Sequence, residues 1–271
     1  MITASIVTYR TDVDELCTVV SCLSNSLVDK IYIVDNSPSD RLRETVNSFC
    51  GEIEYIYGHG NVGYGSAHNI AIRKSITLGA AYHIVINPDI YFDAGVVEKL
   101  SAYMEAEPKI GQLMPRVVYP NGELQYLCKL LPTPIDLIGR RFPLLKSYAK
   151  QRNYRFEMRA SNYDQIMEVP FLSGCFMFLR VDALQKTGGF DDRYFMYCED
   201  MDLCRRIGMA GYKTVYYPSV EIVHAHKKES YKSRSMLRQH IKSAVRYFNT
   251  WGWLFDSYRR RINKMIRKQY E

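Results

Sequence analysis

Three carboxylates crowd into four positions of one short segment. The stretch "FMYCEDMDLCRR" (195–206) places Glu199, Asp200 and Asp202 directly behind an aromatic run. Like charges this close repel, so the cluster favours a site where a cation, a proton or a reacting group offsets the repulsion. The alternative is a helix N-terminus, where acids stabilise the helix dipole and two arginines neutralise them one turn later. The segment alone does not decide between the two.

Two further stretches could hold a metal ion. In "VINPDIYF" a strand ends at Asn87 and Asp89, whose side chains point the same way if the chain is extended. An amide and a carboxylate at this spacing suit a hard divalent cation, and a plain proline-containing turn is the competing interpretation. His224 and His226 end a later strand on one side, as metal ligands or as hydrogen-bonded structural groups.

Two other strand ends suit a nucleotide. Asp35, in "IVDNSPSD", could accept the N–H of a pyrimidine base, or it could form a turn or cap the next helix. "GHGNVGYGSAHN" (58–69) places four glycines between a strand and a helix, where main-chain N–H groups can approach phosphate. The glycine spacing matches neither common phosphate-binding loop, so position rather than pattern supports this role.

Strands alternate with helices through the N-terminal third of the chain. Predicted strands cover 4–9, 30–37, 53–57 and 82–87, and the helices between them include 12–26 and one that ends near residue 78. This order predicts βαβ units, hence an α/β fold with a mostly parallel central sheet flanked by helices. In such sheets ligands bind beyond the carboxyl ends of the strands, where Asp35 and Asp89 lie.

The alternation is lost over residues 123–168, which prolines interrupt and basic residues stud. We expect an insertion over the sheet edge that acts as a lid. Regular structure then resumes, and the predicted elements are a buried strand over 169–180, a helix to about 209, and two strands at 213–217 and 220–224. The expected organisation is a domain over 1–232 followed by a helical tail over 233–271.

Composition is that of an ordinary soluble protein, with 47% hydrophobic and 24% charged residues in 271. No apolar run is long enough to span a bilayer, and no basic leader precedes the short apolar stretch at the N-terminus. The seven cysteines are odd in number and form no CxxC pair, which favours a reduced cytoplasmic protein.

The net charge of +7 is concentrated in the tail. Residues 227–271 carry thirteen Lys or Arg against three acids, a balance of +10 that leaves −3 for the rest of the chain. On one predicted helix a basic stripe adjoins an apolar face; the stripe is Arg234, Arg238, Lys242 and Arg246, and the face is Leu237, Ile241, Ala244, Val245 and Phe248.

Both tryptophans follow this helix, and a second basic cluster runs from Arg259 to Lys268. Basic residues beside an aromatic belt favour an anionic membrane surface. The alternative is an apolar face packed on the domain or on a second subunit in a homodimer. Nucleic acid is disfavoured, because no recognition motif accompanies the charge.

The order of these motifs along the chain resembles that of the inverting family-two glycosyltransferases of the GT-A fold. Within that family the chain is most similar to the rhamnosyltransferase-like branch of bacterial polysaccharide biosynthesis. The resemblance covers about residues 2–250. It rests on the ordered set "SIVTY", Asp35, the glycine-rich loop, "NPD", "SGCFMFLR", "ED" and a late histidine.

The resemblance implies a nucleotide-sugar donor and a divalent metal, Mg²⁺ or Mn²⁺. Asp35 would hold the base, with Thr8, Tyr9 and Arg10 in the same pocket. The residues implied to border the nucleotide-sugar and metal are Asn61, Gly63, Asn87, Asp89 and His224. Asn87 stands where the family usually has the first acid of its DxD motif, which leaves Asp89 as the implied metal ligand.

The resemblance also gives the acidic segment a role. Asp200 matches the catalytic base, which removes the acceptor proton as that oxygen attacks the anomeric carbon in a single displacement. Glu199 would support the site, and Asp202 would be structural. Aromatic side chains at Phe195 and Tyr197 would exclude water and raise the pKa of the base.

The expected function is transfer of L-rhamnose from dTDP-rhamnose to a lipid-linked or growing surface glycan, at the cytoplasmic face of the membrane. A galactofuranosyl or other hexosyl transferase of the same fold is an alternative. A sugar-phosphate nucleotidyltransferase is disfavoured, because "VTYRTDVDEL" lacks the glycine-rich basic loop expected after its first strand. A degenerate GT-A scaffold protein is favoured only by Asn87.

Overall fold

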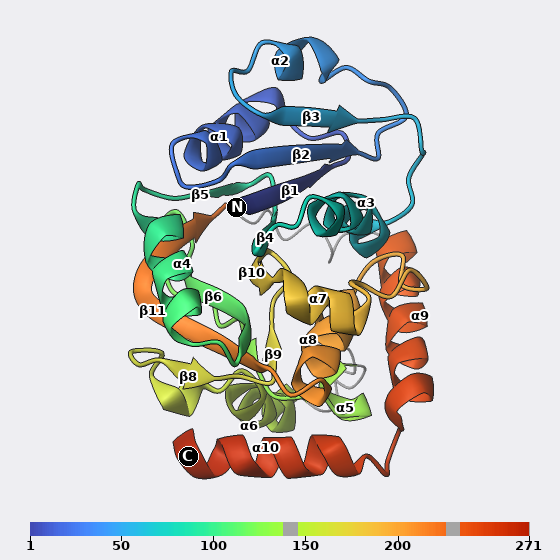
Figure 1. The fold of residues 1–271 in the computed structure, drawn as a ribbon. Coiled ribbons are helices and arrows are strands. Elements are labelled where there is room, and N and C mark those ends of the chain that lie inside the picture. Colours follow the sequence, from blue (N-terminus) through green and yellow to red (C-terminus); the bar gives the residue numbers. More distant parts are fainter. Residues whose placement is uncertain (138–145, 226–233, 271) are drawn as a thin grey trace.

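A nine-stranded mixed sheet runs through the molecule. The computed structural model describes residues 1–137, 146–225 and 234–270 (Figure 1). The strands of the main sheet are β1 Ile2–Thr8, β2 Lys30–Asp35, β3 Ile53–Ile56, β4 Tyr82–Ile86, β5 Ile90–Tyr91, β6 Ile110–Val118, β8 Met167–Glu168, β10 Phe176–Arg180 and β11 Lys213–His224. Their order is β3-β2-β1-β4-β10-β6-β11-β5, and β8 pairs with β11. A separate two-stranded sheet joins β7 Cys128–Lys129 to β9 Phe171–Leu172.

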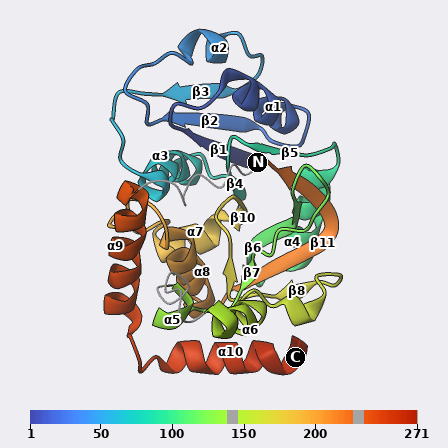
Figure 2. The same ribbon diagram turned by 180° about the vertical axis from the view of Figure 1, so that it is seen from behind.

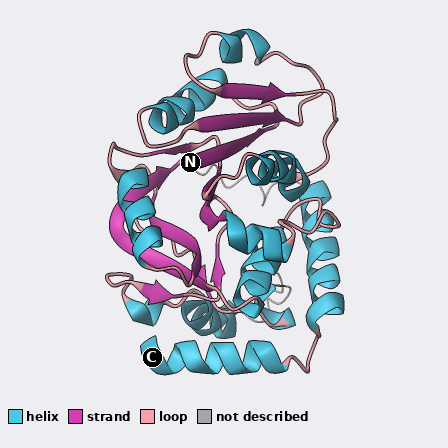
Figure 3. Cartoon of the chain, viewed as in Figure 1, coloured by secondary structure: helices cyan, strands magenta, loops and turns pink. Residues whose placement is uncertain are grey.

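Helices cover both faces of the sheet (Figure 3). They are α1 Val13–Ser24, α2 Arg43–Asn47, α3 Tyr64–Thr77, α4 Val96–Ala106, α5 Pro134–Leu137, α6 Lys146–Phe156, α7 Val181–Thr187, α8 Glu199–Met209, α9 Arg234–Trp251 and α10 Ser257–Tyr270. Parallel pairing joins β1 to β2 and β4, β2 to β3, and β6 to β11. Because β10 is antiparallel to both β4 and β6, six of the nine strands share one direction. The predicted α/β class with a mostly parallel sheet is confirmed.

Alternation along β1 explains why helices lie on both of its faces. All seven residues of β1 are buried. Ile2, Ala4 and Ile6 pack with the buried side of α1, whereas Val7 packs with Ala67 of α3. Asp12 accepts a hydrogen bond from the Asp14 N–H at 2.9 Å, so it caps α1.

The expectation of two strands at 213–217 and 220–224 was wrong. A single strand, β11, covers both, with a register shift against β6 between Tyr217 and Glu221. Pro218 lacks an N–H for a ladder, and this irregularity accommodates it without ending the strand.

The segment 123–168 contains regular structure that was not predicted. Helix α6 lies within it, and β8 at its end joins the main sheet. Arg140 and Arg141, among its basic residues, lie outside the described part of the chain.

The predicted C-terminal helices are present, as α9 and α10. Both lie against the body, α9 beside α3 and α8, and α10 across the end of the molecule beneath α5 and α6 (Figures 1 and 2). The buried face of α9 includes Ala244, Tyr247 and Phe248. Ile241 was predicted in the apolar face but is 43% exposed, because the inward face is rotated toward Tyr247. Among the described helices, none has the length and apolar character needed to cross a bilayer.

Candidate active site

The predicted site residues gather where the carboxyl ends of β1, β2 and β4 meet the N-termini of α3 and α8. Thr8 ends β1, Asp35 ends β2, and Asn87 and Asp89 follow β4. Helix α8 begins at Glu199, and His224 ends β11. Strand-end side chains share one edge of a parallel sheet, so the topology alone brings residues from distant segments together.

Asp35 is completely buried at this edge. One carboxylate oxygen accepts the Ser37 N–H at 2.9 Å, and the other accepts the Tyr55 hydroxyl at 2.5 Å. The neighbouring Thr8 hydroxyl is buried too, without a hydrogen-bond partner among the described residues. Because the Asp35 carboxylate is completely buried, direct contact with a base would require a neighbouring side chain to move aside.

Tyr9 and Arg10 follow Thr8 at the same sheet edge, and both are exposed. Tyr9 is 50% exposed, and the Arg10 guanidinium lies 5.5 Å from the centre of its ring. Arg10 has a positive φ of 55°, and its N–H donates to Ser37 Oγ at 2.8 Å. A non-glycine residue in this left-handed region is strained, a feature that clusters at functional sites.

The glycine-rich loop is tied to β2 through Asn36. The Asn36 amide donates to the Gly63 carbonyl at 3.1 Å, and its oxygen lies 2.9 Å from His59 Nε2. Asn61 is exposed, and its side-chain oxygen accepts the Gly63 N–H at 3.1 Å. This loop is therefore fixed beside Asp35 rather than free of the sheet.

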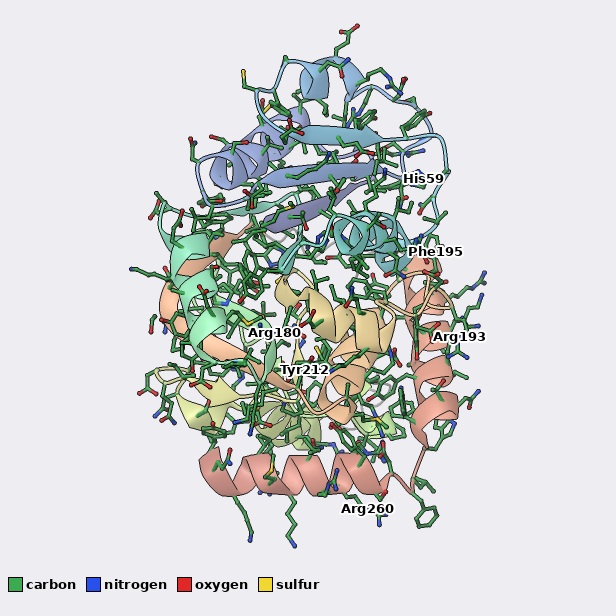
Figure 4. All side chains as sticks on the ribbon, in the orientation of Figure 1. His59, Arg180, Arg193, Phe195, Tyr212 and Arg260 are labelled. Atoms are coloured by element: carbon green, nitrogen blue, oxygen red, sulfur yellow. The ribbon has the colours of Figure 1, made fainter. Side chains whose placement is uncertain are left out.

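Gly63 also touches the acidic segment. Its φ is 91°, and a Cβ there would collide with the Phe195 carbonyl. The N–H of Tyr64 donates to that carbonyl at 2.9 Å, and Figure 4 shows Phe195 close to the start of α3. Only glycine allows this approach, because it has no side chain and tolerates positive φ.

The candidate metal ligands meet between β4 and β11. Asp89 Oδ1 lies 3.3 Å from His224 Nε2, and His224 Nδ1 lies 3.0 Å from Gln125 Oε1. Burial alone would lower the pKa of His224, but the nearby Cys175 and Asp89 raise it to about 10. His226 lies outside the described residues.

Asn87 is turned toward α3. Its side-chain oxygen lies 2.9 Å from the Tyr64 hydroxyl, which lies 2.6 Å from the Gly174 carbonyl. No cluster of three His, Cys, Asp or Glu side chains with metal-binding geometry occurs in the described parts of the chain. Asp89 and His224 thus fit a cation only if a diphosphate and water supply its other ligands.

Asp200 is oriented by two main-chain donors. Its carboxylate accepts the Gly174 N–H at 2.9 Å and the Met201 N–H at 2.8 Å. Burial raises its pKa, although these two N–H groups and Lys129 act against the rise. For Glu199, burial and the adjacent Asp200 raise the pKa well above its ordinary value. The pair therefore combines a buried Glu199, whose pKa is the more strongly raised, with a half-buried Asp200.

Asp202 faces away from these groups and anchors α9. Its carboxylate accepts the Trp251 indole N–H at 2.7 Å and the Arg206 Nε–H at 2.7 Å. Arg206 also donates to the carbonyls of Thr187 and Gly189. These contacts agree with the structural part expected for Asp202.

Comparison with known proteins identifies the family. Residues 5–188, more than half of the chain, match the model described as glycosyl transferase family 2. The chain belongs to glycosyltransferase family 2. Residues 142–267 also match a second model, glycosyl transferase family group 2. The resemblance inferred from sequence is confirmed, and the protein is a nucleotide-sugar glycosyltransferase with a GT-A fold.

Two curated relatives of this glycosyltransferase are rhamnosyltransferases. Rhamnosyltransferase WbbL of Escherichia coli K12 is 30% identical over 228 residues, covering 80% of this chain and 81% of its own. The N-acetylglucosaminyl-diphospho-decaprenol L-rhamnosyltransferase of Mycobacterium tuberculosis (strain CDC 1551 / Oshkosh) is 29% identical over 209 residues, covering 74% and 67%.

A solved structure, GalNAc-T7 with UDP, GalNAc and Mn²⁺, is similar in fold, with a TM-score of 0.68 at 15% identity. The match covers 92% of this glycosyltransferase and 48% of the GalNAc-T7 chain, so this chain spans about half the length of that protein.

Four residues of the site were missed by the sequence interpretation. They are Tyr55, Tyr64, Gln125 and Gly174, each of which contacts a predicted residue. Tyr64 and Gly174 are 110 positions apart, and nothing local in either segment indicates the contact. The sequence interpretation noted the glycine-rich loop but not Tyr64, the residue after Gly63. Tyr64 contacts both Asn87 and Gly174, and the Gly174 N–H in turn binds Asp200.

Proposed function

We propose that this glycosyltransferase transfers L-rhamnose from dTDP-rhamnose, with inversion, to a hydroxyl of a lipid-linked or growing surface glycan. The two curated relatives support the sugar, and the name of the mycobacterial relative includes a lipid-diphosphate acceptor. A negatively charged acceptor of this kind lies at a membrane surface, so we place the reaction at the cytoplasmic face of the membrane.

Asp200 is the proposed base. The observation that carries the proposal is the orientation of its carboxylate by the Gly174 and Met201 N–H groups at the N-terminus of α8. The carboxylate takes the proton of the acceptor hydroxyl while that oxygen bonds to the anomeric carbon. The bond from this carbon to the diphosphate oxygen breaks at the same time, on the opposite face of the sugar. Glu199, held neutral by burial, donates a hydrogen bond within the site.

Asp89 and His224 are the proposed protein ligands of a divalent metal, Mg²⁺ or Mn²⁺. A carboxylate and an imidazole 3.3 Å apart at one strand edge suit a cation that also binds the donor diphosphate, and the imidazole, which Cys175 and Asp89 keep protonated in the metal-free protein, would release its proton on binding. When bound, such a metal stabilises negative charge on the departing diphosphate. Asn87, turned toward Tyr64, would orient the loop that carries Asp89.

The nucleotide is assigned to the edge formed by β1, β2 and the glycine-rich loop. The buried Thr8 hydroxyl, which has no hydrogen-bond partner among the described residues, and the exposed ring of Tyr9 support a ligand in this place. We propose that Asp35 and Arg10 complete the base and ribose pocket, and that Asn61 and Gly63 border the sugar diphosphate. Main-chain N–H groups at the start of α3 favour an anion there.

Replacement of Asp200 by Asn tests the proposed role of the base. We expect kcat to fall by about 10²–10⁴-fold, because the amide cannot accept the proton. Binding of dTDP, measured by isothermal calorimetry with and without Mn²⁺, should be unchanged. A variant with full transfer activity would contradict the assignment, and a wild-type protein that binds no nucleotide diphosphate would favour a scaffold protein.

A further inference from the structure

The turn between α9 and α10 presents large apolar side chains to solvent. In this turn, residues 252–256, Trp253 is 38%, Leu254 70% and Phe255 85% exposed. Figure 1 places the turn at a corner of the molecule, where α9 ends and α10 begins. Two adjacent apolar side chains this exposed are costly in water, so they point to a surface that covers them.

The main chain of the turn is held in place from inside the protein. Arg205 pairs with Asp256 through two hydrogen bonds of 2.6 and 2.8 Å, and both side chains are buried. The Arg259 guanidinium donates to the Trp253 carbonyl at 3.2 Å, and Arg260 donates to the Leu254 carbonyl at 3.3 Å. The exposure of Leu254 and Phe255 is therefore built in, since four charged side chains fix the backbone that carries them.

Positive charge continues from the turn along α10. A groove of about 500 Å³ along α10 has five basic side chains and, among the described residues, no acid in its lining. These are Arg259, Arg260, Lys264, Arg267 and Lys268. Figure 4 shows Arg260 at the outer side of α10, distant from Phe195 at the candidate active site. The charge suits phosphate groups, and the adjacent apolar side chains suit the acyl region beneath them.

We propose that Leu254 and Phe255 insert into an anionic bilayer while the basic face of α10 binds the lipid phosphates. Apolar and aromatic side chains beside Lys and Arg have the composition of an interfacial membrane anchor. Each basic residue near an anionic leaflet adds attraction, and the groove supplies several. A second protein copy would bring a second set of like charges to this face, which disfavours that occupant. The inference rests on the proposed location of the reaction but concerns a different surface.

Sedimentation with lipid vesicles tests the anchor. The full chain is mixed with vesicles of phosphatidylcholine alone, or of equal parts phosphatidylcholine and phosphatidylglycerol. We expect binding only to the anionic vesicles. The double variants Leu254→Ser/Phe255→Ser and Lys264→Glu/Lys268→Glu should each bind them at least roughly tenfold more weakly. Leu27→Ser is the matched control, because Leu27 is 53% exposed elsewhere on the surface and its loss should change nothing.

Several results would overturn the anchor. One is that the wild-type protein does not bind anionic vesicles. Another is that Leu254→Ser/Phe255→Ser binds them as the wild type does. The third is that the wild type is a dimer which this double variant converts to a monomer. The dimer result, read by light scattering, would assign the turn to a second copy. Calorimetry with dTDP is run on the same samples, so a failure of vesicle binding is distinguishable from a failure of the proposed transferase activity.

Discussion

At the scale of single residues, Glu199 and Asp200 are adjacent acids in different environments. Glu199 is buried, with one carboxylate oxygen lacking a partner among the described residues, whereas Asp200 is half-buried and accepts two main-chain hydrogen bonds. Burial raises the pKa of both, more strongly for Glu199. When their environments separate the pKa values of two carboxyl groups in this way, the group with the higher pKa suits the neutral role and the other suits the role of base.

Glu199→Gln should therefore retain most of the activity, since glutamine resembles the neutral acid. The value of kcat/KM for transfer should fall on acidification, because Asp200 is protonated below its raised pKa and can no longer accept a proton. This fall should begin at a higher pH than an ordinary aspartate would give, in both the wild type and Glu199→Gln. A pH profile of rhamnosyl transfer measures both effects. Complete loss of activity in Glu199→Gln, with Asp200→Asn still active, would exchange the two roles.

The contact between Tyr55 and Asp35 determines how the nucleotide base of the donor is bound. If Asp35 acts through Tyr55, then Tyr55→Phe and Asp35→Asn should both weaken dTDP binding, by about three- to tenfold for a lost hydrogen bond. If Asp35 must bind the base itself, removing the Tyr55 hydroxyl should leave binding unchanged or stronger. Isothermal calorimetry separates the two cases, and an exposed variant such as Tyr154→Phe is the control.

At the scale of elements, α9 supports the loop that leads to Asp200, the proposed base. Ser243 donates to the Met196 carbonyl at 2.7 Å, and His240 packs edge-on against Tyr197 with ring centres 5.2 Å apart. Tyr197 and Cys198 both have positive φ, near 69° and 68°, immediately before α8 begins. Two consecutive strained residues persist only where surrounding contacts hold them.

Ser243→Ala should consequently lower kcat by several-fold while the melting temperature falls only slightly. The loss removes one hydrogen bond, worth about 0.5–1.5 kcal/mol, from a loop that positions Asp200. Ser235→Ala, at an exposed position of the same helix, should change neither quantity. Equal loss of stability and activity in the two variants would contradict a positioning role for α9.

Elements with strong local signals were predictable from sequence. The buried run of β1 and the capped, patterned α1 fall close to their expected bounds. The two strands expected at 213–217 and 220–224 are a single strand because pairing with β6 continues past Pro218. Helix α6 lacks an apolar stripe that would predict it. At the site, the strand ends and acids could be predicted because topology brings them together. Tyr64 and Gly174 could not, since their contact depends on packing between distant segments.

At the scale of the whole molecule, two buried histidines tie helix α3 to the sheet. His83 lies 2.8 Å from both Thr3 Oγ1 and Ser5 Oγ, and Ser5 Oγ lies 2.7 Å from His68. Burial lowers the pKa of His83 to about 3, and burial and His83 hold the pKa of His68 well below its ordinary value. Both rings are therefore neutral in the folded protein.

This pair makes the fold sensitive to acid. The unfolded chain protonates each ring below about pH 6.5, whereas in the folded chain His83 stays neutral until near pH 3 and the pKa of His68 is held well below its ordinary value. Stability from the neutral rings is complete above pH 6.5 and is lost as the pH falls, by up to about 1.4 kcal/mol per histidine per pH unit. Urea unfolding between pH 5 and 8 should show the slope, and His83→Gln should flatten it. An unchanged slope in that variant would assign the effect to carboxylates.

The buried pair of Arg205 and Asp256 has a practical consequence for protein production. Arg205 belongs to α8, the helix that starts with Glu199 and Asp200, so trimming the chain ahead of Asp256 would strand a guanidinium in the interior. An unpaired buried charge of this kind destabilises a fold by about 3–5 kcal/mol. A version truncated for better solubility would thus remove the proposed membrane-binding turn but also destabilise the folded enzyme. Polar replacements at Leu254 and Phe255 would raise solubility for crystallisation while leaving the pair of Arg205 and Asp256 intact.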